Sequence, residues 1–232
     1  MTLDPVADQV NKDRVTARQL RELLHGAGRT FDHHVFISYA QDPDLERAQR
    51  LRARLQRLGR RWWERRRLRV FLDVASLSAG EGLSKKIEAA LHSSAGLAVL
   101  AGESSAGSRW VAEELRSWWE WERPAPLIVL TGGEIAWSDA ERDFVWPAST
   151  ALNQAGFAGR YREQPLWVDL RPRHTGWLRA RRHERRQLTD AAVSIAAAVL
   201  QVERDALARH EERLRRRRLV TVAGAAALTA AV

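Results

Sequence analysis

The sequence has no cysteine among its 232 residues. The chain therefore forms no disulfide and no thiolate zinc site, it has no cysteine nucleophile, and its composition suits a reducing compartment. Three motifs are also missing. The lack of Gly-x4-Gly-Lys-Ser/Thr excludes a P-loop NTPase, and the lack of Gly-x-Ser-x-Gly excludes the nucleophile elbow of α/β-hydrolases. No Gly-x-Gly-x-x-Gly follows the first predicted strand, which disfavours a dinucleotide-binding Rossmann fold.

The positive charge is concentrated at one end of the chain. The net charge is +9, and residues 171–218, with 14 arginines against 6 acidic residues, account for +8 of it. A basic stripe of this kind can bind phosphate backbones. No base-stacking aromatic residues are interleaved with these arginines, so we expect no specific nucleic-acid partner.

No apolar run reaches the 20 or so residues that a membrane span needs. The longest candidate is residues 219–232, an uncharged stretch that directly follows Arg215–Arg218. We interpret it as the start of a transmembrane helix, whose flanking arginines would keep residues 1–218 on the cytoplasmic side of the inner membrane. The alternative is a short alanine-rich tail packed on the domain. Residues 1–28 are too polar and acidic for a signal peptide.

Short apolar segments alternate with helical patterns along the rest of the chain. The predicted strands are residues 34–40, 68–73, 96–102, 125–133 and 165–171. The predicted helices are residues 10–24, 42–66, 83–92, the segment that begins at "SRWVAEEL" (108–115), and 185–214. Alternation of this kind predicts an α/β fold, with a parallel sheet covered by helices on both faces.

Five strands without a dinucleotide fingerprint favour the flavodoxin-like strand order 2-1-3-4-5. In that order the ligand crevice lies at the carboxyl ends of the first and third strands, which are Ser38–Tyr39 and Gly102–Ser105. His33 and His34 have no second ligand cluster in the sequence to support a metal site, so no metal is expected.

The motifs resemble a known family. "FDHHVFISYA" resembles box 1 of Toll/interleukin-1 receptor (TIR) domains, and "FLDVASLSAGEGLSKKIEAAL" resembles box 2 with its BB loop. "SRWVAEEL" is similar to the TIR Trp-x-x-x-Glu motif. The resemblance covers residues 31–171. Together with the helical spacing of residues 10–24 and the apolar run at the C-terminus, it divides the chain into an N-terminal helical extension (1–30), a TIR domain (31–175), an arginine-rich C-terminal helix (176–218) and the start of a membrane span (219–232).

Further segments, including "WWERRRLRVFLD" and "LIVLTGGEIAW", resemble bacterial TIR proteins that continue into a membrane span. Many of those proteins carry WD40 or other sensor repeats beyond the span. The resemblance therefore implies three kinds of partner: other TIR domains, the membrane, and sensor repeats that are absent from this chain.

The two glutamates of "SRWVAEEL" are distinguished by helix geometry. At about 100° per residue, Glu114 falls roughly 40° from Trp110, and Glu113 falls roughly 60° to its other side. The predicted buried stripe, at roughly 80–140°, is Val111, Leu115 and Trp118. Glu114 therefore lies on the shoulder of this stripe, and Glu113 lies on the solvent face.

The resemblance selects the same residue, because the catalytic glutamate of TIR NADases is the fourth residue after the tryptophan. Nicotinamide leaves NAD+ as a neutral molecule from a cationic pyridinium and needs no general acid. One carboxylate, Glu114, is then enough to stabilise the developing oxocarbenium charge, while Trp110 forms a wall of the pocket. NAD+ is the substrate, and no cofactor is expected. The alternative is that Glu114 is only a helix-end charge paired with a basic residue.

Other positions follow from the resemblance alone. Phe36, Ser38 and Tyr39 match box 1 and are implied to line the substrate pocket; the alternative for Phe36 is core packing. The BB-loop positions implied to drive TIR–TIR assembly are Asp73, Ser76, Leu77 and Gly80. Several TIR NADases have a basic residue after the Ser-Tyr pair, where this chain has Ala40 and Gln41. Lys85 and Arg69 are the two candidates to supply this missing positive charge.

Two functions remain open at this stage. The first is a self-assembling enzyme that cleaves NAD+ to nicotinamide and ADP-ribose, or a cyclic isomer, in bacterial defence. The second is a non-catalytic TIR–TIR module that transmits a signal from a membrane-linked sensor. The Trp110–Glu114 spacing favours the enzyme, and the absence of a basic residue at Ala40 or Gln41 favours the module.

Overall fold

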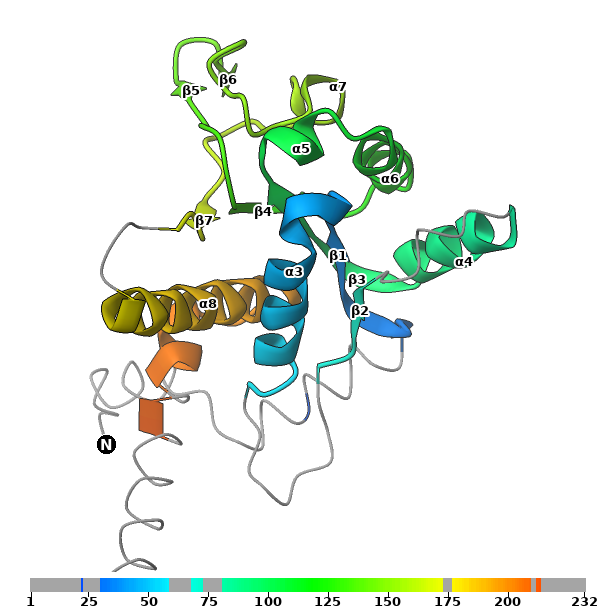
Figure 1. Cartoon of the computed structure of the whole chain (residues 1–232). Helices are drawn as coiled ribbons and strands as arrows, with labels where there is room; N and C mark the ends of the chain where they lie inside the picture. Colours follow the sequence, from blue (N-terminus) through cyan, green and yellow to red (C-terminus); the bar gives the residue numbers. More distant parts are fainter. Residues whose placement is uncertain are drawn as a thin grey trace, which may run out of the picture.

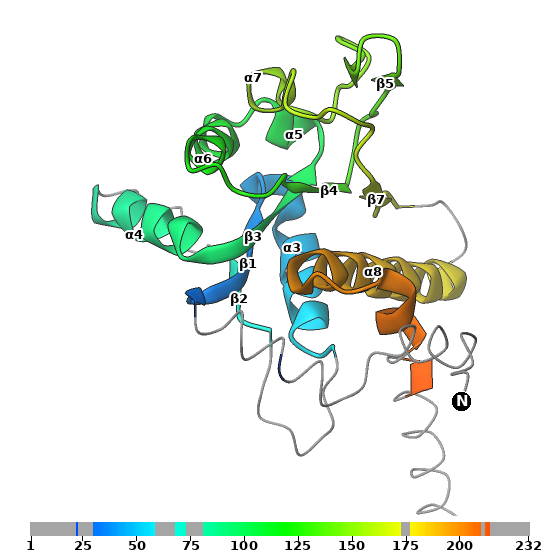
Figure 2. The same ribbon diagram turned by 180° about the vertical axis from the view of Figure 1, so that it is seen from behind.

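Five parallel strands form one sheet in the order β2-β1-β3-β4-β7 (Figures 1 and 2). The computed structural model describes residues 22, 30–58, 68–72, 81–172, 177–209 and 212–213. The sheet strands are β1 (His33–Ser38), β2 (Val70–Leu72), β3 (Ser94–Ala101), β4 (Leu127–Leu130) and β7 (Trp167–Asp169). Because β7 is the fifth strand of this sheet along the chain, the predicted α/β fold and the order 2-1-3-4-5 are confirmed.

Successive residues of each strand face opposite sides of the sheet. In β1, Val35 and Ile37 join one buried cluster, whereas Phe36 joins the other. The first cluster lies under α3 (Gln41–Leu55) and α8 (Trp177–Leu200), and the second lies under α4 (Glu81–His92) and α6 (Arg109–Glu120). The two helix pairs lie on opposite sides of the sheet in Figures 1 and 2.

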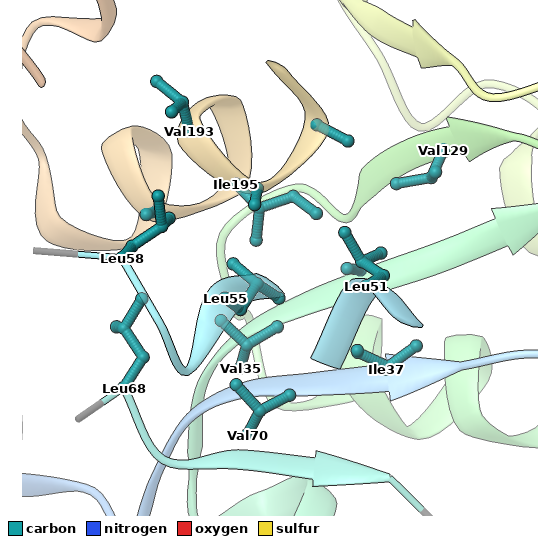
Figure 3. Close-up of a cluster of buried hydrophobic side chains, with 14 of the residues drawn as sticks. Val35, Ile37, Leu51, Leu55, Leu58, Leu68, Val70, Val129, Val193 and Ile195 are labelled. Carbon is teal, nitrogen blue, oxygen red and sulfur yellow. The ribbon is translucent and has the colours of Figure 1, made fainter. Parts of the chain in front are cut away.

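The core between the sheet and α3 is built from leucines one helical turn apart. Ala48, Leu51 and Leu55 of α3 are fully buried, and they meet Val193 and Ile195 of α8 (Figure 3). Burying one such side chain contributes about 1.5–3 kcal/mol. These buried residues are therefore the surface that attaches the helix to the sheet.

The ends of α3 differ from the prediction of a helix over 42–66. Asp42 has an extended backbone (φ −116°, ψ 129°), so the regular helix begins at Pro43, where a fixed φ and a missing N–H cost nothing. At the other end the helix stops at Leu55, and residues 56–58 form a turn. The turn brings Leu58 into the core.

The last helix was predicted over 185–214, but α8 begins at Trp177 and ends at Leu200. Gln201 takes φ 53°, and the Val202 N–H donates to the Ala197 carbonyl at 2.9 Å, which closes the helix end in a Schellman arrangement. A second short helix follows over residues 204–209. Since a glutamine rather than a glycine takes the left-handed conformation, no residue type marked this stop.

Residues 131–166 contain elements that were not predicted. They form the hairpin of β5 (Trp137–Ser138) and β6 (Asp143–Phe144), followed by the short helix α7 (Gln154–Phe157). Phe144 and Phe157 are buried here, and Tyr161 packs on both rings and donates its hydroxyl to the Pro126 carbonyl at 3.0 Å. Burial raises the pKa of the Tyr161 phenol, so it remains a hydrogen-bond donor at physiological pH.

Candidate active site

The carboxyl edge of the sheet carries the predicted crevice. β1 ends at Ser38, β3 at Ala101 and β4 at Leu130. The strand order reverses between β1 and β3, because the chain passes from β1 to β2 on one side and from β3 to β4 on the other. At such a reversal, the loops that follow the two neighbouring strands run in opposite directions. The crevice between these loops is where open α/β sheets usually bind their ligands. The start of α3 and the short helix α5 (Glu103–Ala106) lie at this edge (Figure 1).

Helix α6 begins beside this edge and is fixed by its apolar stripe. Ser108 caps the helix by accepting the Val111 N–H at 3.4 Å. Val111, Leu115 and Trp118 are buried against the sheet, which confirms the predicted stripe. The same stripe determines where every other side chain of this helix lies.

Two contacts identify what lies on each flank of α6. The Trp119 indole donates to the Gly156 carbonyl of α7 at 2.9 Å, so one flank faces α7. The Trp121 ring meets the His92 ring of α4 edge-on, with centroids 4.8 Å apart, so the opposite flank faces α4. Glu114 falls between the directions of Trp118 and Trp121 around the helix, and it is half-buried. Helix geometry therefore directs it to the α4 side of α6, on the shoulder of the buried stripe.

The neighbouring glutamate has a surface role. Arg109 Nε donates to Glu113 Oε1 at 2.8 Å, one helical turn apart, and the Arg109 side chain is 83% exposed. This hydrogen bond raises the pKa of the Arg109 guanidinium. Glu113 is thus one half of an exposed ion pair, an arrangement that contributes little to stability.

Trp110 lies one turn before Glu114 and is one of the most exposed large apolar side chains, at 54%. The Arg109 guanidinium carbon lies 6.0 Å from the Trp110 ring centroid. The ring is thus partly covered by Arg109, and its exposed part is available for contact with a planar ligand.

The box 1 residues divide between the two faces of the sheet. Ser38 shares the α4–α6 face with Phe36, whereas Tyr39 packs against the α3–α8 core on the opposite face. Phe36 is 1% exposed and stacks on Phe71 with centroids 5.2 Å apart, which favours the core-packing alternative for this residue. The Ser38 hydroxyl is buried and has no hydrogen-bond partner among the described residues. Of the three, Ser38 lies on the same face as Glu114.

A buried polar cluster that we did not predict also lies at the carboxyl edge. Asp44, in the first turn of α3, accepts the Thr131 hydroxyl on Oδ2 and Arg47 Nη1 on Oδ1, both at 3.1 Å. The Asp44 and Thr131 side chains are both almost completely buried. The two residues are 87 positions apart in the sequence, so no local pattern pairs them.

Residues 35–146 match the family model described as TIR domain. The match covers 112 of the 232 residues of the chain. The matched segment begins in β1 and ends just after β6, and it includes both Ser38 and Glu114.

The chain is also similar to a larger protein. It is 34% identical over 197 residues to a protein from an Actinoplanes species named NAD(+) hydrolase ApTIR. The aligned region covers 80% of this chain and 26% of that relative, so the chain spans about a quarter of the relative's length.

Arg69 and Lys85, the two possible replacements for the basic residue that is missing after Ser38–Tyr39, lie in different parts of the structure. Arg69 lies at the amino edge of the sheet, where its backbone N–H donates to His34 Nδ1 at 3.0 Å and its guanidinium to the Phe31 carbonyl at 2.5 Å. It is thus at the wrong end of the strands for the predicted crevice. Lys85 is exposed on α4.

Several predicted features fall outside the described residues: the BB-loop positions Asp73, Ser76, Leu77 and Gly80, the possible span 219–232, and most of the helix over 10–24. Within the described ranges, no helix is long and apolar enough to cross a membrane. The same ranges contain no group of three or more His, Asp or Glu side chains that could hold a metal ion.

Proposed function

We propose that this TIR domain hydrolyses NAD+ to nicotinamide and ADP-ribose, with Glu114 as the catalytic carboxylate. The observation that carries the proposal is that Glu114 is half-buried on α6, the helix that follows β3 and α5, and comes one turn after the exposed Trp110. The similarity to a protein named NAD(+) hydrolase supports the same chemistry.

The proposed reaction needs only one carboxylate at the reacting ribose. The bond between ribose C1′ and the pyridinium nitrogen breaks, its electron pair neutralises the ring, and nicotinamide leaves without needing a proton. Positive charge then develops on the ribose as an oxocarbenium ion, and a half-buried carboxylate stabilises that charge more than water does. Water attacks C1′ and loses a proton to give ADP-ribose; attack by a group of the ADP-ribose itself gives a cyclic isomer.

The neighbouring residues support distinct roles in this scheme. The exposed Trp110 face would stack against a planar ring of the substrate. Ser38, whose buried hydroxyl has no partner in the part of the chain that the structure describes, would hydrogen-bond to the ribose. Tyr39 and Phe36 would support the pocket through the packing of β1 rather than by contact with the substrate.

The test compares the two adjacent glutamates. Glu114→Gln should lower the rate of nicotinamide release by about 100-fold or more, because it removes the charge that stabilises the transition state. Glu113→Gln is the matched control, since it removes the same charge one residue away and breaks only the exposed pair with Arg109. Equal loss in both variants, at equal folded concentration, would rule out the assigned role of Glu114.

A second candidate function is a non-catalytic TIR–TIR module. It is favoured by Ala40 and Gln41, which offer no cation for the NAD+ phosphates, and by the location of Arg69 at the opposite edge of the sheet. A module would assemble through its TIR surfaces without consuming NAD+. Light scattering together with an NAD+ assay separates the two functions, since assembly without nicotinamide release supports only the module.

We further propose that the domain self-associates through the segment 73–80, acts in bacterial defence signalling, and is held at the inner membrane by residues 219–232, with sensor repeats as partners. The apolar stretch after Arg215–Arg218 supports the membrane anchor. Fractionation of cells expressing residues 1–232 or 1–218 tests it: the longer chain should sediment with membranes, and equal distribution of the two would count against anchoring.

A further inference from the structure

We infer that Asp44 and Thr131 are positioning residues, which fix the segment that carries Glu114 to the edge of the sheet. The inference rests on the proposed NAD+ hydrolysis. Neither residue contacts Glu114 in the arrangement described above. Their effect would pass through the β3–α6 connector, defined as residues 102–108.

The proton arrangement at Thr131 shows which hydrogen bond matters. The Thr131 hydroxyl oxygen lies 3.1 Å from Asp44 Oδ2 and 3.1 Å from the Ala101 carbonyl oxygen. The Ala101 carbonyl already accepts the Thr131 N–H at 2.7 Å and the Gly132 N–H at 3.3 Å. The Thr131 hydroxyl therefore donates its single proton to the Asp44 carboxylate, which is a stronger acceptor than the Ala101 carbonyl.

Asp44 consequently joins two parts of the carboxyl edge. Thr131 follows β4 and Asp44 lies in the first turn of α3, which follows β1. The remaining carboxylate oxygen is occupied by Arg47, so the buried charge is paired. The order of strands in the sheet places β3 between β1 and β4, and the Asp44–Thr131 bond therefore spans the end of β3.

The first residue of the connector lies against this bond. A Cβ atom on Gly102 would be 3.1 Å from Thr131 Oγ1 and 3.6 Å from Asp44 Oδ2, so the Gly102 backbone is packed directly on the pair. From there three hydrogen bonds hold the connector. Ser105 Oγ accepts the Gly102 N–H at 2.8 Å, Asn153 Nδ2 donates to the Ala106 carbonyl at 2.7 Å, and Ser108 caps α6.

The connector therefore transmits the position of the Asp44–Thr131 pair to the start of α6, and Glu114 follows about one and a half turns later. A displacement of about 1 Å at a reacting group can lower a rate by about 100-fold. Loss of the pair should thus reduce the catalytic rate of the folded enzyme rather than only its stability.

The experiment uses the full chain with Thr131→Val, Thr131→Ser and, as a remote control, Thr189→Val, whose hydroxyl donates to the Arg185 carbonyl of α8 at 2.7 Å. Nicotinamide release gives kcat and KM well below the unfolding midpoint of every variant. Hydrogen exchange measures the amides of residues 102–108. Asp44→Asn replaces Thr131→Val if the latter does not fold.

We expect Thr131→Val to lower kcat about 10-fold or more, to leave KM within about 2-fold, and to speed exchange in residues 102–108. Thr131→Ser and Thr189→Val should match the wild type in kcat, in KM and in the exchange rate of residues 102–108. Wild-type kcat in Thr131→Val, or a reduced kcat without faster exchange in the connector, would overturn the inference. If the wild type releases no nicotinamide while exchange still responds to Thr131→Val, the proposed function fails and the catalytic role of the pair fails with it.

Discussion

At the scale of single residues, two adjacent glutamates occupy different environments because a helix turns about 100° at each position. This difference could be predicted from sequence, since Val111, Leu115 and Trp118 alone define the buried side of α6. The environment of Ser38 and the Asp44–Thr131 bond could not be predicted. Both depend on contacts between segments far apart in the chain, which no spacing within one segment encodes.

His33 gives a prediction about pH at this scale. Partial burial against the Phe71 ring lowers the pKa of His33, and Arg69 adds to this effect while Asp32 opposes it. The folded state therefore binds a proton less readily than the unfolded state. The stability that this residue contributes is fully present above about pH 6.5 and is lost as the pH falls from 6.5 through the lower pKa of the folded state.

Urea unfolding at pH 7.5 and pH 5.5 measures this effect, with His33→Gln as the variant without a titrating group. The free energy of unfolding should decrease more in the wild type than in His33→Gln between these two pH values. Identical decreases in the two proteins would show that His33 does not contribute to the pH dependence.

At the scale of elements, the type of each long helix and strand was predictable, but their ends were not. The apolar spacing of Ala48, Leu51 and Leu55 identified the buried side of α3. The end of α8 depends on Gln201 in a left-handed conformation, which residue type does not reveal. The β5–β6 hairpin was missed because each strand has only two residues, too few to show an alternating pattern.

The approach of α8 to β3 gives a prediction at this scale. A Cβ atom on Gly96 would lie 2.6 Å from Val199 Cγ2, so Gly96→Ala should destabilise the fold by about 1–3 kcal/mol through overpacking. Adding Val199→Ala removes the clashing methyl groups. A double-mutant cycle by urea unfolding should then show a cost well below the sum of the two single changes. Simple additivity would mean that the two side chains do not compete for space.

At the scale of the whole molecule, α8 completes the core beside the sheet. Its buried residues belong to the same cluster as those of α3 and the sheet: Ala191, Ala192, Val193, Ile195, Ala196, Ala197 and Leu200. The sequence analysis predicted a TIR domain that ends at residue 175 and a separate helix that begins at 176. The residues on the two sides of this boundary share one hydrophobic core. We interpret α8 as part of the folded unit.

Truncation tests this interpretation. A chain that ends at residue 175 keeps α3 but loses the part of the cover that α8 provides on the same face of the sheet. It should fail to unfold cooperatively, because exposure of those core residues to water removes much of the hydrophobic stabilisation. A chain that ends at residue 218 keeps α8 and is the control. Cooperative thermal unfolding of the shorter chain, at a midpoint close to that of the control, would show that α8 is a separate appendage.

The central claim is that one carboxylate, Glu114, cleaves the glycosidic bond of NAD+. The most direct measurement is the rate of nicotinamide release, followed by NMR, for the wild type and Glu114→Gln at equal concentrations of assembled protein. The account predicts release of nicotinamide and an ADP-ribose product in equal amounts by the wild type, and a rate at least about 100-fold lower for Glu114→Gln. Equal rates in the two proteins, or no release by an assembled wild type, would contradict it.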